Sequence, residues 1–248
     1  MSVLTDFVTT CEQVFQDNLL CILLVGSAQR DETTPFSDID VIVIIQTMNV
    51  DQVARLRSVI RSSAGLLDCS ILCQDELPVD PNLFYLGSHG CYQLELVLKR
   101  AKCVFGQNVL LEIPSPTERD IRLSIARKVI EYTWWTRRMF VESNRKRTLE
   151  MNYKLNSRLV KMIRDILYLR GIRGSIIDPV GSIVDIFLRE YIELFTEVET
   201  QVIANLGDTG RVNVDTSNMS DEYFLVRYSV VNKIHKEMAR MVLVSTDG

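Results

Sequence analysis

The sequence predicts a chain of two parts: an α+β (α/β-type) N-terminal half with a mixed β-sheet and flanking helices, followed by a C-terminal helical bundle. Three observations support this fold class. Helical and strand-like hydrophobic patterns alternate in the first part of the chain. Pro114 and Pro116 then interrupt regular structure. Beyond them, the hydrophobic spacing is helical throughout, so we expect domains over residues 1–112 and 117–248.

The elements of the N-terminal half follow from their hydrophobic spacing. Apolar residues recur at helical spacing between Val3 and Phe15, which predicts an opening amphipathic helix. Apolar runs of strand length follow, and segments with helical spacing separate them. We expect strands over residues 19–25, 38–46, 66–73 and 103–105, and further helices over residues 53–60 and 86–102.

The C-terminal half contains helix start and stop signals. Thr117 and Ser182 each precede an acidic residue, Asp120 and Asp185, by three positions, a spacing similar to a capping box. Gly171 is a stop signal for the second helix. The expected helices cover about 117–141, 150–169, a stretch from 182 onward, and about 220–241, with a polar connection over 206–219. Four such helices would form an antiparallel bundle.

Composition and charge argue against several protein classes. The chain has 47% hydrophobic and 24% charged residues, which is ordinary for a globular protein. Its net charge of −4 argues against a surface that binds nucleic acid all over. We expect no membrane segment, because no apolar run approaches the ~18 residues required. Six cysteines without a C-x2-C pair predict reduced thiols and a cytoplasmic protein.

The strongest chemical signal is a glycine-serine turn followed by closely spaced acids. Gly26 and Ser27 end an apolar strand, and Asp38 and Asp40 begin the next one after ten intervening residues. Since residues i and i+2 share one face of a strand, both carboxylates point the same way, roughly 7 Å apart. Their repulsion favours a site for divalent cations, the alternative being two solvated acids at a strand end. Asp68 supplies a third carboxylate if its strand lies beside theirs.

The glycine-serine pair, the spacer and the sequence Asp-Ile-Asp-Val resemble the signature of the DNA polymerase β-like nucleotidyltransferase superfamily, of the antibiotic or minimal type. The resemblance covers about residues 20–73 and, more loosely, residues 99–110. The helical half is similar in layout to the second domain of antibiotic nucleotidyltransferases, where a helical bundle helps to bind the acceptor.

The resemblance implies roles for individual residues. It implies that Asp38 and Asp40 bind two Mg²⁺ ions, with Mn²⁺ as the alternative, and that Asp68 ligates one of them. It also implies that Asp68 helps to deprotonate the attacking hydroxyl. Gly26 and Ser27 would hold the outer phosphates of an NTP, for which ATP is the expected donor.

Other polar residues are weaker candidates. Ser37, beside the first acid, is assigned to nucleotide binding. Lys154 and Arg158 lie on a basic helix stripe that could steady the γ-phosphate, although a solvated stripe is the alternative. Trp134 and Trp135 are expected to pack in the bundle. Glu150 and Asp165 are further acids in the helical half, but their spacing singles out neither.

The resulting functional prediction is an Mg²⁺-dependent enzyme that moves a nucleoside monophosphate from an NTP to an acceptor hydroxyl and releases pyrophosphate. The acceptor stays open between an aminoglycoside-like small molecule, an RNA end and a protein. Base preference and the formation of a homodimer are also open. The alternative from another class is a non-catalytic regulator that binds a nucleotide or a partner.

Overall fold

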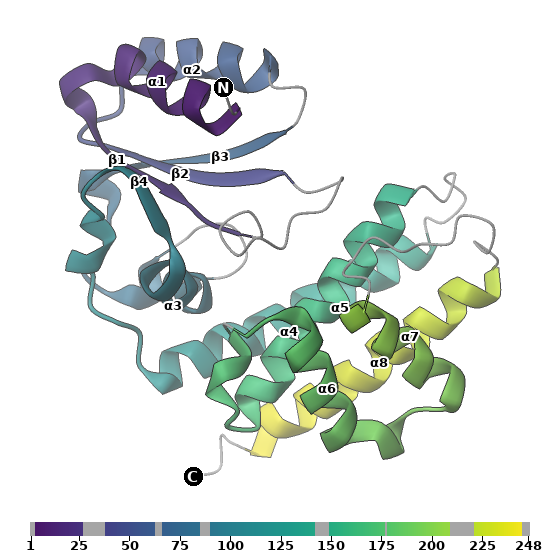
Figure 1. Ribbon diagram of the computed structural model, residues 1–248. Coiled ribbons are helices and arrows are strands. Elements are labelled where there is room, and N and C mark those ends of the chain that lie inside the picture. The colour runs from purple at the N-terminus through teal and green to yellow at the C-terminus, as the bar shows by residue number, and fades with distance from the viewer. Residues whose placement is uncertain are drawn as a thin grey trace. The chain divides into compact units, whose positions relative to one another are not determined.

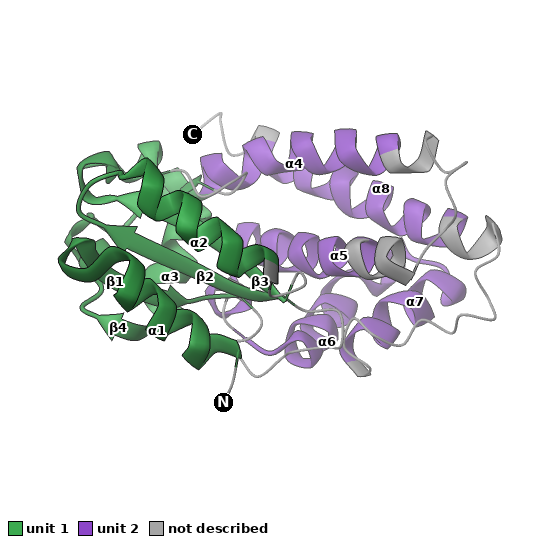
Figure 2. Cartoon of the chain, turned by 90° about the horizontal axis from the view of Figure 1, so that it is seen from above, with its two compact units in different colours: residues 1–121 green, residues 122–248 purple. Residues whose placement is uncertain are grey.

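The computed structural model describes residues 3–26, 38–62, 66–84, 90–141, 149–176, 178–208 and 221–244. The chain divides into two compact units, residues 1–121 and 122–248 (Figure 2). The first unit contains the sheet, and the second consists of helices and their connections. In the described ranges, no helix combines the length and the apolar character needed to cross a membrane.

A four-stranded sheet lies at the centre of the first unit, in the order β3-β2-β1-β4. Its strands are β1 (Leu19–Leu24), β2 (Ile39–Ile45), β3 (Leu67–Cys73) and β4 (Lys102–Gly106). β1 pairs antiparallel with both β2 and β4, whereas β2 and β3 run parallel. The prediction of a mixed sheet is therefore confirmed.

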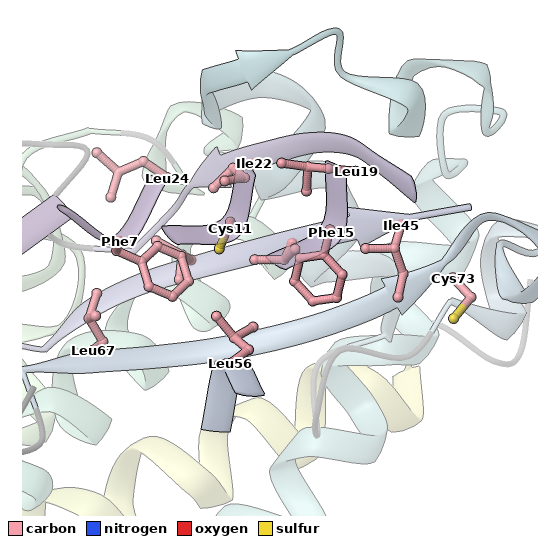
Figure 3. Close-up of a cluster of buried hydrophobic side chains, with 12 residues drawn as sticks. Phe7, Cys11, Phe15, Leu19, Ile22, Leu24, Ile45, Leu56, Leu67 and Cys73 are labelled. Carbon is pink, nitrogen blue, oxygen red and sulfur yellow. The ribbon is translucent and has the colours of Figure 1, made fainter. Parts of the chain in front are cut away.

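Helices cover both faces of this sheet (Figure 1). They are α1 (Val3–Phe15), α2 (Val50–Ser62) and α3 (Gly90–Arg100). On one face, Phe7 and Phe15 of α1 and Leu56 of α2 pack against strand residues such as Ile22 and Ile45 (Figure 3). On the other face, α3 packs against the alternate strand residues. The sheet is thus buried on both sides, which explains its almost continuous apolar strands.

The second unit contains five helices within its described ranges. They are α4 (Glu118–Val141), which begins in the first unit, α5 (Leu149–Leu169), α6 (Val180–Tyr191), α7 (Glu197–Asp208) and α8 (Asp221–Val244). The predicted start of α4 is confirmed, because the Thr117 backbone N–H donates to Asp120 (2.8 Å) and the Asp120 N–H donates to the Thr117 hydroxyl (3.2 Å). Gly171, with φ of +94°, follows the end of α5 as predicted.

Two expectations for the helices are wrong. Ser182 does not begin a helix: α6 begins at Val180 after Pro179, whose fixed φ suits a helix start. Helix α7 was not predicted at all. Its signal was present, because Thr196 and Glu199 form a reciprocal capping box in which Thr196 N–H donates to the Glu199 carboxylate (2.8 Å) and Glu199 N–H donates to the Thr196 hydroxyl (3.3 Å).

All six cysteines are free thiols. Burial raises the pKa of Cys11 and of Cys69 to about 12, so neither side chain is a thiolate at neutral pH. Cys69 and Cys73 lie on the face of β3 that packs under α1 and α2. The neighbouring residue Asp68 therefore projects from the opposite face.

Glu199 also joins α7 to α8. It is almost fully buried and accepts hydrogen bonds from the Ser229 hydroxyl (2.6 Å) and the Lys233 ammonium (2.6 Å). Burial raises the pKa of Glu199, but the bonds from Lys233, Ser229 and Thr196 outweigh burial and lower the pKa to about 2. The charged form of Glu199 is therefore the one that stabilises the fold.

We expect Glu199→Gln to lower the free energy of unfolding by about 2 kcal/mol at neutral pH, since it removes charge-assisted bonds. Because the folded-state pKa of about 2 lies below the usual 4.5, this contribution is complete above pH 4.5 and is lost as the pH falls toward 2. Urea unfolding of both proteins across this range measures it. The exposed Glu197→Gln is the control, and a difference that persists unchanged at pH 2 would contradict the assignment.

Candidate metal and nucleotide site

Three carboxylates meet at one end of strands β2 and β3. The parallel register pairs Asp40 with Asp68, and Asp38 precedes Asp40 by two residues. One carboxylate oxygen from each of the three lies within 4.8 Å of the other two. Asp38 and Asp68 are exposed, and Asp40 is partly buried. The three acids singled out by the sequence therefore lie together at a position that solvent can reach.

Strand alternation explains why these acids share one face. Ile42 and Ile44 of β2 are buried in the core on the α3 side of the sheet. Asp40 and Asp38 continue the same two-residue period toward the start of the strand. The hydrophobic face of β2 thus becomes acidic where the core ends, while Val41 and Val43 still pack on the opposite face.

Gly26 packs directly against this acidic cluster. It follows β1 with φ of +72°, a conformation that residues with a side chain rarely adopt. A Cβ atom at this position would lie 1.8 Å from Oδ2 of Asp40, which is a severe clash. The preceding Val25 N–H donates to the Asp40 carbonyl oxygen at 3.0 Å. Only glycine therefore allows the β1 turn and the Asp40 carboxylate to occupy their places together.

We expect Gly26→Ala to lower the rate of the nucleotidyl transfer predicted from the sequence about 100-fold, because the new methyl group must displace the Asp40 carboxylate by an ångström or more. Gly171→Ala is the matched control. Gly171 also has positive φ (+94°), but a Cβ there would meet nothing within 4 Å. That variant should lose about 1 kcal/mol of stability from backbone strain and keep its activity. Transfer assays and urea unfolding separate the two effects, and full activity in Gly26→Ala would contradict the role of this turn.

The donor set fits a hard divalent cation. All three groups are carboxylates, the ligands that Mg²⁺ and Mn²⁺ favour, and no softer ligand belongs to the group. Oxygens on opposite sides of one Mg²⁺ are about 4.2 Å apart, so side chains spread over 4.8 Å need only small rotations to reach a shared ion. Because exposed carboxylates change rotamer easily, these rotations cost little free energy.

The structure describes only some of the remaining predicted site residues. Ser27 and Ser37 lie outside the described residues, and so does the side chain of Lys154. Arg158 is described, and its guanidinium lies over the indole ring of Trp135 within the second unit.

Two expectations about the helical half can be compared with the structure directly. Trp134 does not pack in the bundle: its side chain is 58% exposed, with the Arg138 guanidinium over its ring. Asp165 is completely buried and lies 3.5 Å from the ammonium of Lys128. Asp165 is therefore inaccessible as a base for a solvent-borne substrate.

Comparison with known proteins gives a clear answer for the fold. No protein-family model and no curated protein sequence matches the chain. Among solved structures, it is similar to spectinomycin adenyltransferase AAD(9) from Enterococcus faecialis, crystallised with ATP and spectinomycin. The two share 15% sequence identity and a TM-score of 0.63, over 94% of this chain and 97% of that chain. The chain therefore has the fold of this adenyltransferase.

The shared fold includes the helical half, because the similarity extends over nearly the whole of both chains. It confirms the fold class predicted from the sequence, a mixed sheet with flanking helices followed by C-terminal helices. The three carboxylates and the Gly26 turn thus lie in a chain that shares its fold with an adenyltransferase.

Proposed function

We propose that this chain is an Mg²⁺-dependent nucleotidyltransferase that moves a nucleoside monophosphate from ATP or another NTP to an acceptor hydroxyl and releases pyrophosphate. The observation that supports it most strongly is the cluster of Asp38, Asp40 and Asp68, with oxygens within 4.8 Å of one another, in a nucleotidyltransferase fold. Three neighbouring carboxylates without a cation would repel one another, so a bound cation explains why they are gathered.

Each residue has a role in this proposal. Asp38 and Asp40 would hold the metal ions, which supply charge neutralisation for the phosphate oxygens when bound. Asp68 would complete this metal site and accept the proton of the acceptor hydroxyl. Gly26 and Ser27 would place backbone N–H groups beside the outer phosphates. Orientation of the two substrates would provide much of the remaining rate enhancement.

The two parts of the chain would have different roles. Residues 1–112 would form the catalytic domain, and residues 117–248 the acceptor-binding domain. Ser37, Lys154 and Arg158 are further proposed nucleotide-binding residues. Mn²⁺ would replace Mg²⁺ at the same carboxylates, since both ions accept oxygen ligands.

A small-molecule acceptor has the best support. The solved neighbour was crystallised with spectinomycin as well as ATP, and its similarity extends over the helical half. The net charge of −4 also disfavours a polyanionic acceptor such as RNA. Aminoglycoside-like and aminocyclitol hydroxyls are therefore the first class to test.

The experiment is to incubate the protein with Mg²⁺, α-labelled NTPs and a panel of aminocyclitols, aminoglycosides and RNA ends, and to measure labelled product and pyrophosphate. The proposal expects labelled product, stoichiometric pyrophosphate and loss of both with EDTA. If RNA is the acceptor, binding should fall steeply with added salt, which a small-molecule acceptor does not require. NTP binding without product or pyrophosphate across the panel would instead favour a non-catalytic nucleotide-binding regulator.

A further inference from the structure

A polar seam lies between helices α4 and α5 of the second unit. Lys128, Tyr132 and Trp135 are spaced i, i+4 and i+7, so they share one face of α4. Arg158 and Asp165 are seven residues apart on one face of α5. Lys128 contacts Asp165, and Trp135 contacts Arg158, so the two helices run antiparallel along this seam.

Two hydrogen-bond donors in the seam have no acceptor. Within the described part of the chain, neither the Tyr132 hydroxyl nor Nη1 of Arg158 has a hydrogen-bond partner, although both atoms are buried. The Tyr132 side chain is only 5% exposed. Burying an unsatisfied polar group costs about 1–3 kcal/mol, so two together are a substantial penalty for a folded protein.

The Tyr132 hydroxyl and the Arg158 guanidinium act on each other electrostatically. Burial, and then the Asp165 carboxylate, raise the pKa of Tyr132 well above its usual range, whereas the positive charge of Arg158 acts to lower it. Burial likewise lowers the pKa of Arg158 to about 9, against the effect of Tyr132 and of Glu131. A guanidinium in this environment is stabilised by a nearby negative charge.

The charges in the seam leave an excess cation. Lys128 lies 3.5 Å from Asp165, and both side chains are almost completely buried, so their charges offset each other. In the described ranges, no carboxylate forms an ion pair with Arg158. Glu131, an exposed residue of α4, is the acid that acts on Arg158 from a longer range. The seam therefore combines unmatched positive charge with unmatched donors.

We propose that this seam binds a small phosphate-type oxyanion, with the Tyr132 hydroxyl and the Arg158 guanidinium as its donors. The Arg158 guanidinium also lies over the indole ring of Trp135. Arg158 and Trp135 are both partly exposed, so the anion would enter at these two residues and meet Tyr132 at the inner end. A water molecule would accept the same hydrogen bonds but would leave the Arg158 charge uncompensated.

The probe is inorganic phosphate, and the reporter is the indole of Trp135. The chain has two tryptophans, so Trp134→Phe leaves Trp135 as the single fluorophore. In this background we expect a saturable change in emission with phosphate, which chloride at equal ionic strength does not reproduce. Arg158→Gln and Tyr132→Phe should each weaken phosphate binding at least about 10-fold, because each removes one hydrogen bond to an anion.

Two further variants sharpen the test. Glu131→Gln should tighten phosphate binding several-fold, because it removes the carboxylate that competes for Arg158. Lys161→Gln, three residues beyond Arg158 and exposed, should leave phosphate binding within 2-fold. Circular dichroism establishes that each variant is folded, and Tyr132→Phe keeps the ring volume, so a failure of Arg158→Gln to fold does not remove the test.

Competition identifies the source of the anion. Displacement of phosphate by pyrophosphate and ATP would indicate a nucleotide-derived group, whereas binding of phosphate alone would indicate a free anion. Arg158 is also proposed above to bind the nucleotide, but this measurement is made without metal and without acceptor, and Asp38→Asn should not alter it. Its failure is therefore distinguishable from failure of the proposed transfer activity. A non-saturable change in emission, or equal phosphate affinity in wild type and Tyr132→Phe, would overturn the proposal. Water molecules would then be the hydrogen-bond acceptors in the seam.

Discussion

Replacement of both Asp38 and Asp40 by asparagine should reduce nucleotidyl transfer at least about 1,000-fold, equivalent to roughly 4 kcal/mol of transition-state stabilisation. Asparagine keeps the shape of each side chain but removes two of the three negative charges gathered within 4.8 Å. The site would then bind divalent cations weakly and would lose their neutralisation of the phosphates. Initial rates with saturating Mg²⁺, NTP and acceptor measure this loss.

The same cluster predicts an opposite effect on stability. Without metal, Asp68→Asn should raise the free energy of unfolding by about 1 kcal/mol, because carboxylates with oxygens within 4.8 Å of one another repel even in a largely aqueous environment. Mg²⁺ should stabilise wild type and have little effect on Asp68→Asn. Asp75→Asn, an exposed acid of the same unit outside the cluster, is the control. Equal Mg²⁺ stabilisation of all three proteins would remove Asp68 from the metal site.

The second large effect is expected in the core of the helical unit. Asp165→Leu should lower the free energy of unfolding by about 3–5 kcal/mol, since it leaves the ammonium of Lys128 in a buried site without its carboxylate. Burial already lowers the pKa of Lys128, and Asp165 opposes that shift. Urea unfolding at neutral pH measures the loss.

A double variant separates this penalty from lost packing. Lys128→Met combined with Asp165→Leu removes both charges and should recover most of the stability, because an apolar pair of similar size requires no compensation. Arg240→Gln is the matched surface control: Arg240 contacts Glu237 at 3.2 Å and its side chain is mostly exposed, so the change should stay below about 0.5 kcal/mol. A double variant as unstable as Asp165→Leu would show that the ion pair itself is not the cause.

Local patterns predicted most of the first unit because they act within a few residues. The period of two in β2 places Asp38 and Asp40 on one face whatever the neighbouring strands are. The helical spacing of apolar residues likewise predicted α1, and the cap at Thr117 predicted the start of α4. Where prediction failed, at Ser182, two similar local signals competed and Pro179 was the stronger one.

Other features depended on contacts between distant segments. Trp134 and Trp135 are adjacent on one helix, yet the first is largely exposed and the second supports Arg158. Helical periodicity separates their directions by about 100°, but it does not say which direction meets another helix. The burial of Asp165 beside Lys128 follows only from the pairing of α4 with α5.

By itself, the sequence determined the order of helices and strands in the sheet half, the three acids and the glycine before them. Only the tertiary structure decided that β3 lies parallel to β2 with Asp68 beside Asp40, and that Asp40 packs against the turn at Gly26. The physical reason is the range of the forces involved. Backbone stereochemistry and hydrophobic spacing act between near neighbours in the chain, whereas strand pairing is chosen by the burial of the whole sheet.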